Sequence, residues 1–286
     1  MNYEHLFSFA VFAEHLSFTH AARRLALSQP ALHVQVKKLS ADVGVPLYTR
    51  RGKALSLTPA GERVAVFARE VHARGDALVA ELRGNADDGA ITLATGAFAF
   101  VRLLAPAVRK LGRGGSRLRL VTANADSAAQ AVREARADLA VIGARSAPRD
   151  LESTRLRTVG QHVVVPEGHG LARRTKVRPR DLAGERLVVP PSPSAHREAV
   201  DRLLAGTPWE IGAEVHGWDA MLALASLGVG LTIVNDLCSP PRGMVAVPLE
   251  GAAPIAYFVL WREPLRAPAR RFVDVVVASC RAAGAS

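Results

Sequence analysis

The chain has 286 residues, a length that suggests about two domains at roughly 150 residues each. Its 49% hydrophobic and 22% charged residues are the composition of a soluble globular protein. The formal charge of +11 favours a polyanionic partner such as nucleic acid, although a solvated basic surface explains the same excess.

Three further observations exclude other classes of protein. The two cysteines, Cys238 and Cys280, lie far apart, which argues against a disulfide framework and for a reducing compartment. The longest apolar run, 221–234, is interrupted and too short to span a bilayer. The first residues have neither the basic nor the apolar region of a signal peptide. We therefore expect a cytoplasmic protein with no membrane partner.

The first predicted elements are three helices. Residues 3–16 carry apolar side chains at helical spacing, and 18–39 reads as two short helices joined at Leu27-Ser28. Ser28 is placed to cap the second helix, and Pro30 falls in its first turn, where a missing N–H costs nothing. A buried stripe of Leu32, Val36 and Leu39 leaves amide and cationic groups on the opposite side. A short helix of this kind is what the DNA major groove accepts.

A small hairpin follows this motif. The alternating runs 47–50 and 55–58 flank a basic glycine turn at 51–53. Beside a helix-turn-helix, a hairpin with a basic tip reads as a wing that touches phosphates or the minor groove. An ordinary surface hairpin is the alternative.

A long helix is predicted to begin at Thr58-Pro59, with Thr58 as its cap and Pro59 in the first helical position. Its apolar residues are spaced by three, four or seven, close to a coiled-coil seam, with Arg74 and Gly75 as an interruption. Such a helix between domains favours pairing with a second copy, and packing on its own domain is the alternative. The predicted dimer residues are Val64, Phe67, Val71, Leu78 and Leu82.

A polar break at 85–89 is the predicted hinge, and strands and helices alternate beyond it. Strands are expected near 90–94, 117–122, 139–142, 163–165, 187–189, 214–215, 229–234 and 255–261. Helices are expected over 100–110, 127–135, 196–204, 219–227 and 267–283. This alternation predicts an α/β fold with mostly parallel strands in two small lobes and a ligand crevice between them.

In order along the chain, these segments resemble the LysR-type transcriptional regulators. The motifs are Leu6-x-x-Phe9, Leu16-Ser17-Phe18-Thr19-x-Ala21-Ala22-x-x-Leu25, Leu27-Ser28-Gln29-Pro30-Ala31-Leu32, Gly44-x-x-Leu47-Tyr48-x-Arg50 and Leu57-Thr58-Pro59-Ala60-Gly61. The dense match covers about the first 62 residues, and beyond them the likeness is one of architecture.

The resemblance implies a winged helix-turn-helix domain at 1–58, a dimerising linker helix and hinge at 59–88, and a two-lobed effector domain at 89–286. This effector domain is similar to periplasmic binding proteins, with lobe I at about 89–160 and 267–286 and lobe II at about 161–266. The implied partners are double-stranded DNA, a small-molecule effector, further copies in a homodimer or homotetramer, and RNA polymerase. No cofactor is implied.

The DNA-reading surface departs from the family pattern. His33-Val34 stands where the family has serine and a basic or polar residue, and Leu39-Ser40 stands where it has Leu-Glu. We therefore do not transfer a family base preference. Gln29 is placed to read an adenine, whereas Lys37 and Lys38 are placed to hold phosphate. The candidate DNA-binding residues are Thr19, Arg23, Ser28, Gln29, Pro30, His33, Val34, Lys37, Lys38, Arg50, Arg51 and Lys53.

The effector loop also departs from the pattern. In the family this loop supplies serine or threonine hydroxyls to a carboxylate, whereas here 95–100 has one hydroxyl and two phenylalanines. We infer an apolar or aromatic effector, with burial of both rings in a core as the alternative. Other candidates stand at predicted strand ends or helix starts. The full set is Thr95, Ala97, Phe98, Phe100, Asn124, Gly143, Ser192, Ser194, Trp218 and Asn235.

Signatures of enzymes are weak. No glycine-rich phosphate loop or Gly-x-Ser-x-Gly elbow occurs, and the histidines lack partners at metal-ligand spacing. We expect no catalytic residues and no metal. Two alternatives stay open: a small-molecule binding protein built on 90–286, and a winged-helix repressor with an unrelated sensor domain.

Overall fold

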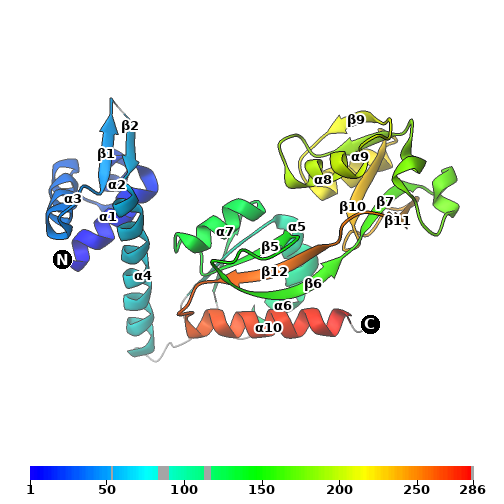
Figure 1. The fold of residues 1–286 in the computed structure, drawn as a ribbon. Helices are drawn as coiled ribbons and strands as arrows, with labels where there is room; N and C mark the ends of the chain where they lie inside the picture. The colour runs from blue at the N-terminus through cyan, green and yellow to red at the C-terminus, as the bar shows by residue number, and fades with distance from the viewer. Residues whose placement is uncertain (53, 83–89, 113–116, 285–286) are drawn as a thin grey trace.

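A computed structural model describes residues 1–52, 54–82, 90–112 and 117–284 of the chain. Figure 1 shows a small helical domain with a hairpin, one long helix, and an α/β region with two sheets. Two sequence-based predictions, the hinge at 85–89 and the contribution of Lys53 to the wing, lie outside the described residues.

The N-terminal domain is a three-helix unit with a hairpin. Its helices are α1 (Tyr3–His15), α2 (Phe18–Leu25) and α3 (Gln29–Val43), and the hairpin pairs β1 (Tyr48–Arg51) with β2 (Ala54–Leu57). The predicted stripe of α3 is confirmed, because Leu32, Val36 and Leu39 are fully buried in one cluster with residues of α1 and α2.

Local signals in the sequence define the helix ends. The Ser28 hydroxyl accepts a hydrogen bond from the Ala31 amide at 3.2 Å, which confirms it as the cap of α3. Gly44 ends the same helix in the left-handed conformation, with φ of 80°. The Thr58 hydroxyl accepts from the Gly61 amide at 3.0 Å and so caps the next helix.

The long helix α4 (Pro59–Leu82) is continuous. A Cβ at Gly61 would lie 1.8 Å from the Leu47 carbonyl oxygen, so only glycine lets the first turn rest on the backbone before the wing. Gly75 does not interrupt the helix. Instead it leaves room for Tyr3, whose hydroxyl would be 3.3 Å from a Cβ at that position.

Lobe I is a five-stranded sheet of order β4-β3-β5-β12-β6. The strands are β3 (Ile91–Thr95), β4 (Leu118–Thr122), β5 (Leu139–Ala144), β6 (Glu152–Val159) and β12 (Ile255–Trp261). One face is covered by α6 (Ala105–Gly112) and α10 (Ala267–Gly284), and the other by α7 (Ala125–Arg133). A helical run of α5 (Ala97–Ala99) and the π-helical segment η1 (Phe100–Leu104) leads into α6.

Lobe II is a second five-stranded sheet of order β11-β7-β10-β8-β9. The strands are β7 (Gln161–Pro166), β8 (Arg186–Val189), β9 (Glu210–Glu214), β10 (Leu231–Asn235) and β11 (Met244–Pro248). Helix α8 (Ala195–Leu203) covers one face, together with two 3-10 turns (Gly170–Arg173 and Pro179–Leu182). Helix α9 (Trp218–Ser226) covers the other.

Two sequence-based predictions about the lobes are wrong. The strand at 255–261 is predicted in lobe II, but β12 pairs with β5 and β6 in lobe I. An element's place in a series of strands and helices does not determine which sheet it joins, because that depends on the return of the chain between the lobes. The strands are also not mostly parallel: of the eight described ladders in the two lobes, four are antiparallel. Strands β6 and β11 are not predicted from the sequence.

Candidate nucleic-acid interface and effector crevice

The exposed face of α3 lies opposite its buried stripe. Gln29, Pro30, His33, Lys37 and Lys38 are all exposed on this helix. Val34 is half exposed, at 50%, and adds an apolar group to this polar face. Because the buried stripe anchors the helix, this face is free to enter a groove.

Contacts within the domain orient two of these side chains. The Thr19 hydroxyl, on α2, lies 3.4 Å from the Gln29 side-chain oxygen and donates to it. The His33 ring nitrogen Nε2 lies 3.3 Å from the Tyr48 hydroxyl, and its ring centroid lies 5.0 Å from that of Phe18. The imidazole is therefore held between α2 and the hairpin by contacts within the domain itself.

The wing presents its cations to solvent. Arg50 and Arg51 are exposed, and the Arg50 Nε donates to the Gly52 carbonyl at 2.9 Å, which closes the tip on itself. The Thr49 and Ser56 hydroxyls pair across the two strands at 2.9 Å. Arg23 of α2 and Ser28 before α3 are exposed as well.

Helix α4 carries an unusual set of exposed apolar side chains. Phe67 is 44% exposed, Leu78 54% and Leu82 77%, whereas Val64 packs against the core of the N-terminal domain and Val71 is half-buried. Of the predicted dimer residues, Val64 therefore supports its own domain, whereas Phe67, Leu78 and Leu82 are exposed and available to a partner.

Among the described residues, the contacts between the two lobes include three pairs of aromatic or polar side chains. Phe98 of α5 lies against Trp218 of α9, with ring centroids 5.4 Å apart. Arg102 of η1 and Asp219 of α9 form an ion pair at 3.9 Å. The Asn235 amide nitrogen, at the end of β10, donates to the Tyr257 hydroxyl of β12 at 3.0 Å. Tyr257 is not among the sequence-based candidates, because nothing in the sequence indicates that β12 returns to lobe I. The ion pair is also not among them, because Arg102 and Asp219 lie far apart in the chain.

Several predicted effector residues have structural tasks. The Thr95 hydroxyl is buried and donates to the Val141 carbonyl at 2.8 Å. Asn124 and Ser194 cap α7 and α8 by accepting hydrogen bonds from the backbone amides of Ser127 and Arg197. Gly143 makes room for the ring of Tyr257, which would lie 3.2 Å from a Cβ at that position.

The remaining predicted effector residues differ in their surroundings. Phe100 packs against the lobe I core, which accounts for its apolar character without a ligand. Ala97 and Ser192 are exposed. Among the predicted effector residues, Phe98, Trp218 and Asn235 meet side chains across the crevice.

Three titratable groups near the contact between the lobes are uncharged at neutral pH, and the Arg102–Asp219 ion pair lies beside them. Burial lowers the pKa of His196 to about 4, and its ring stacks on Trp218 with centroids 4.5 Å apart. Burial also raises the pKa of Tyr257 to about 12, and the pKa of the Cys238 thiol to about 12. Neutral rings and a thiol that stays protonated therefore surround the contact of Phe98 with Trp218, with one ion pair beside them.

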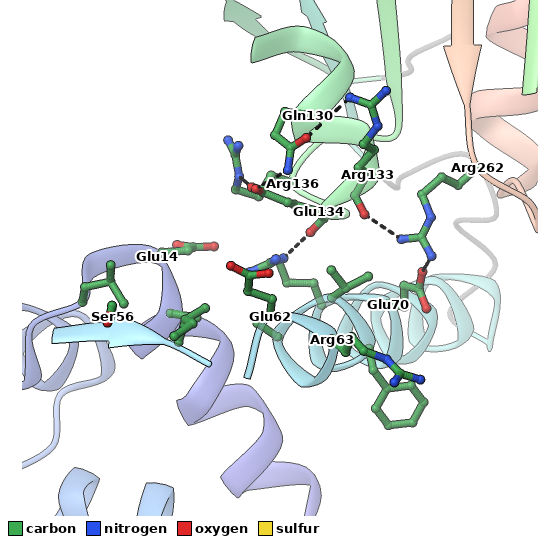
Figure 2. A pocket seen from close by; sticks show the side chains of 17 residues that line it. Glu14, Ser56, Glu62, Arg63, Glu70, Gln130, Arg133, Glu134, Arg136 and Arg262 are labelled. Atoms are coloured by element: carbon green, nitrogen blue, oxygen red, sulfur yellow. Dashed lines mark hydrogen bonds and ion pairs between the residues drawn. The ribbon is translucent and has the colours of Figure 1, made fainter. Parts of the chain in front are cut away.

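A cavity of about 880 Å³ lies where α4 meets lobe I, as Figure 2 shows. The Arg69 Nε donates to the Glu134 carbonyl at 2.5 Å, and Arg262 pairs with Glu70 at 2.6 Å. Arg262 also donates to the Arg133 carbonyl at 3.2 Å. Sequence reasoning missed this junction, since charged residues on an exposed helix face carry no signal about a distant partner.

Within the described residues, no three histidine, cysteine, aspartate or glutamate side chains gather as a metal site requires. In that same part of the chain, no helix is both long and apolar enough to cross a membrane.

Comparison with protein families identifies both parts of the chain. Residues 3–62 match the family described as "Bacterial regulatory helix-turn-helix protein, lysR family". Residues 84–281 match the "LysR substrate binding domain".

Individual relatives agree with these matches. The RuBisCO operon transcriptional regulator of Allochromatium vinosum is 28% identical over 85% of this chain and 83% of its own length. The small neutral protease regulatory protein of Streptomyces coelicolor is 33% identical over 70% of this chain and 63% of its own length.

Solved structures share the fold. A full-length OxyR variant from Pseudomonas aeruginosa has a TM-score of 0.74 at 19% identity, covering 98% of this chain and 95% of its own. Full-length CbnR in complex with its target DNA has a TM-score of 0.61 at 24% identity, covering 98% of this chain and 100% of its own. With a helix-turn-helix, a long connecting helix and a two-lobed substrate-binding domain in this order, the chain belongs to the LysR family of DNA-binding transcriptional regulators.

Proposed function

We propose that this chain acts in the cytoplasm as a homodimeric or homotetrameric regulator that reads DNA with α3 and answers to a small apolar or aromatic effector. Its role is regulatory and not catalytic. The observation that carries the proposal is the two-sided character of α3, with a fully buried stripe behind an exposed face of amide, imidazole, methyl and ammonium groups.

On DNA, the roles divide by chemistry. Gln29 reads an adenine edge with its amide, and Thr19 holds that amide in place. Val34 offers methyl groups to a thymine methyl, and His33 adds a ring nitrogen. Lys37 and Lys38 hold phosphate, together with Arg23 and the wing arginines.

Assembly uses α4. The exposed apolar side chains Phe67, Leu78 and Leu82 form a narrow stripe that a second copy of the helix covers. Two copies then place two α3 helices on the half-sites of an interrupted palindrome, and RNA polymerase is a further partner at the promoter.

The effector binds between the lobes. Support comes from the ring contacts of Trp218 with Phe98 and with His196. These three residues lie at the starts of α9, α5 and α8. These neutral rings favour an aromatic or apolar guest over a small hydrophilic anion.

Binding to the region upstream of the chain's own gene tests the DNA role. We expect Gln29→Ala to weaken binding to the specific site by about 1–3 kcal/mol and to relax its base preference. Lys37→Ala should weaken binding to all DNA and lower the salt slope by about 1. The control is Lys110→Ala, an exposed lysine on α6.

Footprints and anisotropy titrations at several salt concentrations separate the two variants. Identical behaviour of Gln29→Ala and Lys37→Ala contradicts the division of roles. A wild-type protein that binds no DNA specifically supports the plain binding-protein alternative. A thermal-shift screen of aromatic acids, phenols and amino acids tests which class of effector stabilises the protein. A clear preference for small hydrophilic anions would contradict the proposal of an apolar or aromatic effector.

A further inference from the structure

Phe98 follows a strand of lobe I in the chain, but its side chain packs against lobe II. It lies in the short helix α5, immediately after β3 of lobe I. Its ring packs against the cluster on the α9 side of the lobe II sheet, beside buried side chains such as Val164, Leu222 and Val234. Phe98 therefore crosses the crevice and fills space on the opposite lobe.

The ring that Phe98 meets is already part of an aromatic group. Trp218 begins α9 and has the His196 ring stacked on it, 4.5 Å between centroids and 18° between planes. Phe98 lies 5.4 Å from the same indole at 36°. Ring pairs at these separations attract beyond simple burial, so the position beside Trp218 favours a flat ring.

The segment that carries Phe98 is the first turn of a helical run. Helix α5 has three residues, starts at Gly96 without a side-chain cap, and continues through the π-helical segment η1 into α6. Single π-helical turns are frequent at functional sites. The polar contacts nearby, Arg102 with Asp219 and Asn235 with Tyr257, join the lobes independently of the Phe98 ring.

We propose that the Phe98 ring occupies the place against Trp218 where the ring of the effector binds. A ligand with one flat apolar or aromatic ring binds there by displacing the Phe98 ring. This inference rests on the proposed function, because it names the regulation of the same crevice. Exchange of one ring for another keeps the ring contact with Trp218. A small hydrophilic anion has no ring to contact Trp218, so it cannot compensate for the loss of the Phe98 contact.

The exchange sets both affinity and selectivity. A tethered ring competes at a high effective concentration, so the apparent affinity of the ligand is its intrinsic affinity multiplied by the fraction of time that Phe98 is displaced. Removal of the Phe98 ring should remove this competition and leave an apolar space of ring size, which binds small aromatic molecules.

Full-length Phe98→Ala and wild type test this with indole as the probe and sulfate as the hydrophilic comparison. We expect Phe98→Ala to bind indole at least about tenfold more tightly than wild type by titration calorimetry, with no gain for sulfate. Val101→Ala is the matched control, because Val101 is 60% exposed on the next segment and should behave as wild type. Phe98→Trp keeps a ring in place and should show no gain.

Adding Trp218→Ala to Phe98→Ala should abolish the gain, which locates the probe beside that indole. If Phe98→Ala does not fold, Phe98→Val takes its place under the same criterion of about tenfold tighter indole binding. The inference is overturned if the folded variant gains no affinity, or if the gain survives Trp218→Ala. Operator binding by the same samples separates this from the proposed function: specific DNA binding without an indole gain overturns the ring exchange alone.

Discussion

In α3 the side chains that we propose to read DNA point away from the protein, whereas the proposed effector residues between the lobes point toward one another. Gln29, Val34 and Lys37 stand on the open side of a helix whose other side is anchored by Leu32. Phe98, Trp218 and Asn235 instead contact rings and hydroxyls of the opposite lobe. The outward-facing side chains of α3 are open to a partner, whereas the side chains between the lobes already contact one another.

The largest expected effect tests the two sides of α3. Leu32→Ala removes a fully buried side chain and should destabilise the N-terminal domain by about 2–5 kcal/mol. Val34→Ala, on the exposed side, should leave stability within about 0.5 kcal/mol and change the preferred operator sequence. Denaturant unfolding and binding-site selection measure the two effects. Equal destabilisation by both variants would contradict the assignment of faces.

The next effect tests the inward side chains. Asn235 is buried and bonds Tyr257 and the Leu237 amide, so Asn235→Ala should cost about 1–3 kcal/mol by leaving these groups without partners. Asn124→Ala removes only a helix cap, at about 1 kcal/mol, and is the comparison. Urea unfolding monitored by circular dichroism ranks them. A smaller loss for Asn235→Ala than for Asn124→Ala would argue against the interlobe bond.

A third prediction uses pH. Unfolded His196 takes up a proton near pH 6.5 and folded His196 only near pH 4, so stability should fall as the pH drops through this window. Between about pH 7 and about pH 5.5, wild type should lose about 1 kcal/mol more than His196→Phe, which keeps a ring against Trp218. Chemical denaturation at both pH values checks the slope. Equal slopes would mean that His196 is accessible to protons when folded.

The smallest effect lies at the junction of the two regions. Glu70→Gln removes the ion pair with Arg262 between α4 and lobe I and should change stability by only about 0–1 kcal/mol, since both side chains are about one-third exposed. The informative measurement is small-angle scattering, where we expect a larger radius of gyration for the variant than for Asp76→Asn, an exposed control on the same helix. An unchanged radius would show that the ion pair does not hold α4 against lobe I.

Local signals made the N-terminal domain predictable. Ser28, Pro30, Gly44 and Thr58 act on the residues beside them, so capping, helix ends and the wing followed from the order of residues. The buried stripe of α3 followed from its period. The contacts of Thr19 with Gln29 and of His33 with Tyr48 did not, because they join separate elements.

The effector region shows the limit of such signals. The residue types around the crevice were recognised, but the sequence could not say that Thr95 and Asn124 serve the backbone while Phe98 crosses to the other lobe. The strand at 255–261 is predictable from its residues, but its lobe is not.

The sequence by itself determined the helix-turn-helix, the exposed polar face of α3, the long helix α4 and the α/β character of the remainder, since these depend on periodicity and on capping between near neighbours. Only the tertiary structure decided that β12 completes lobe I, that Phe98 packs against Trp218, and that Arg69 and Arg262 join α4 to lobe I. These contacts link residues far apart in the chain, and their formation depends on how the lobes fold back on each other.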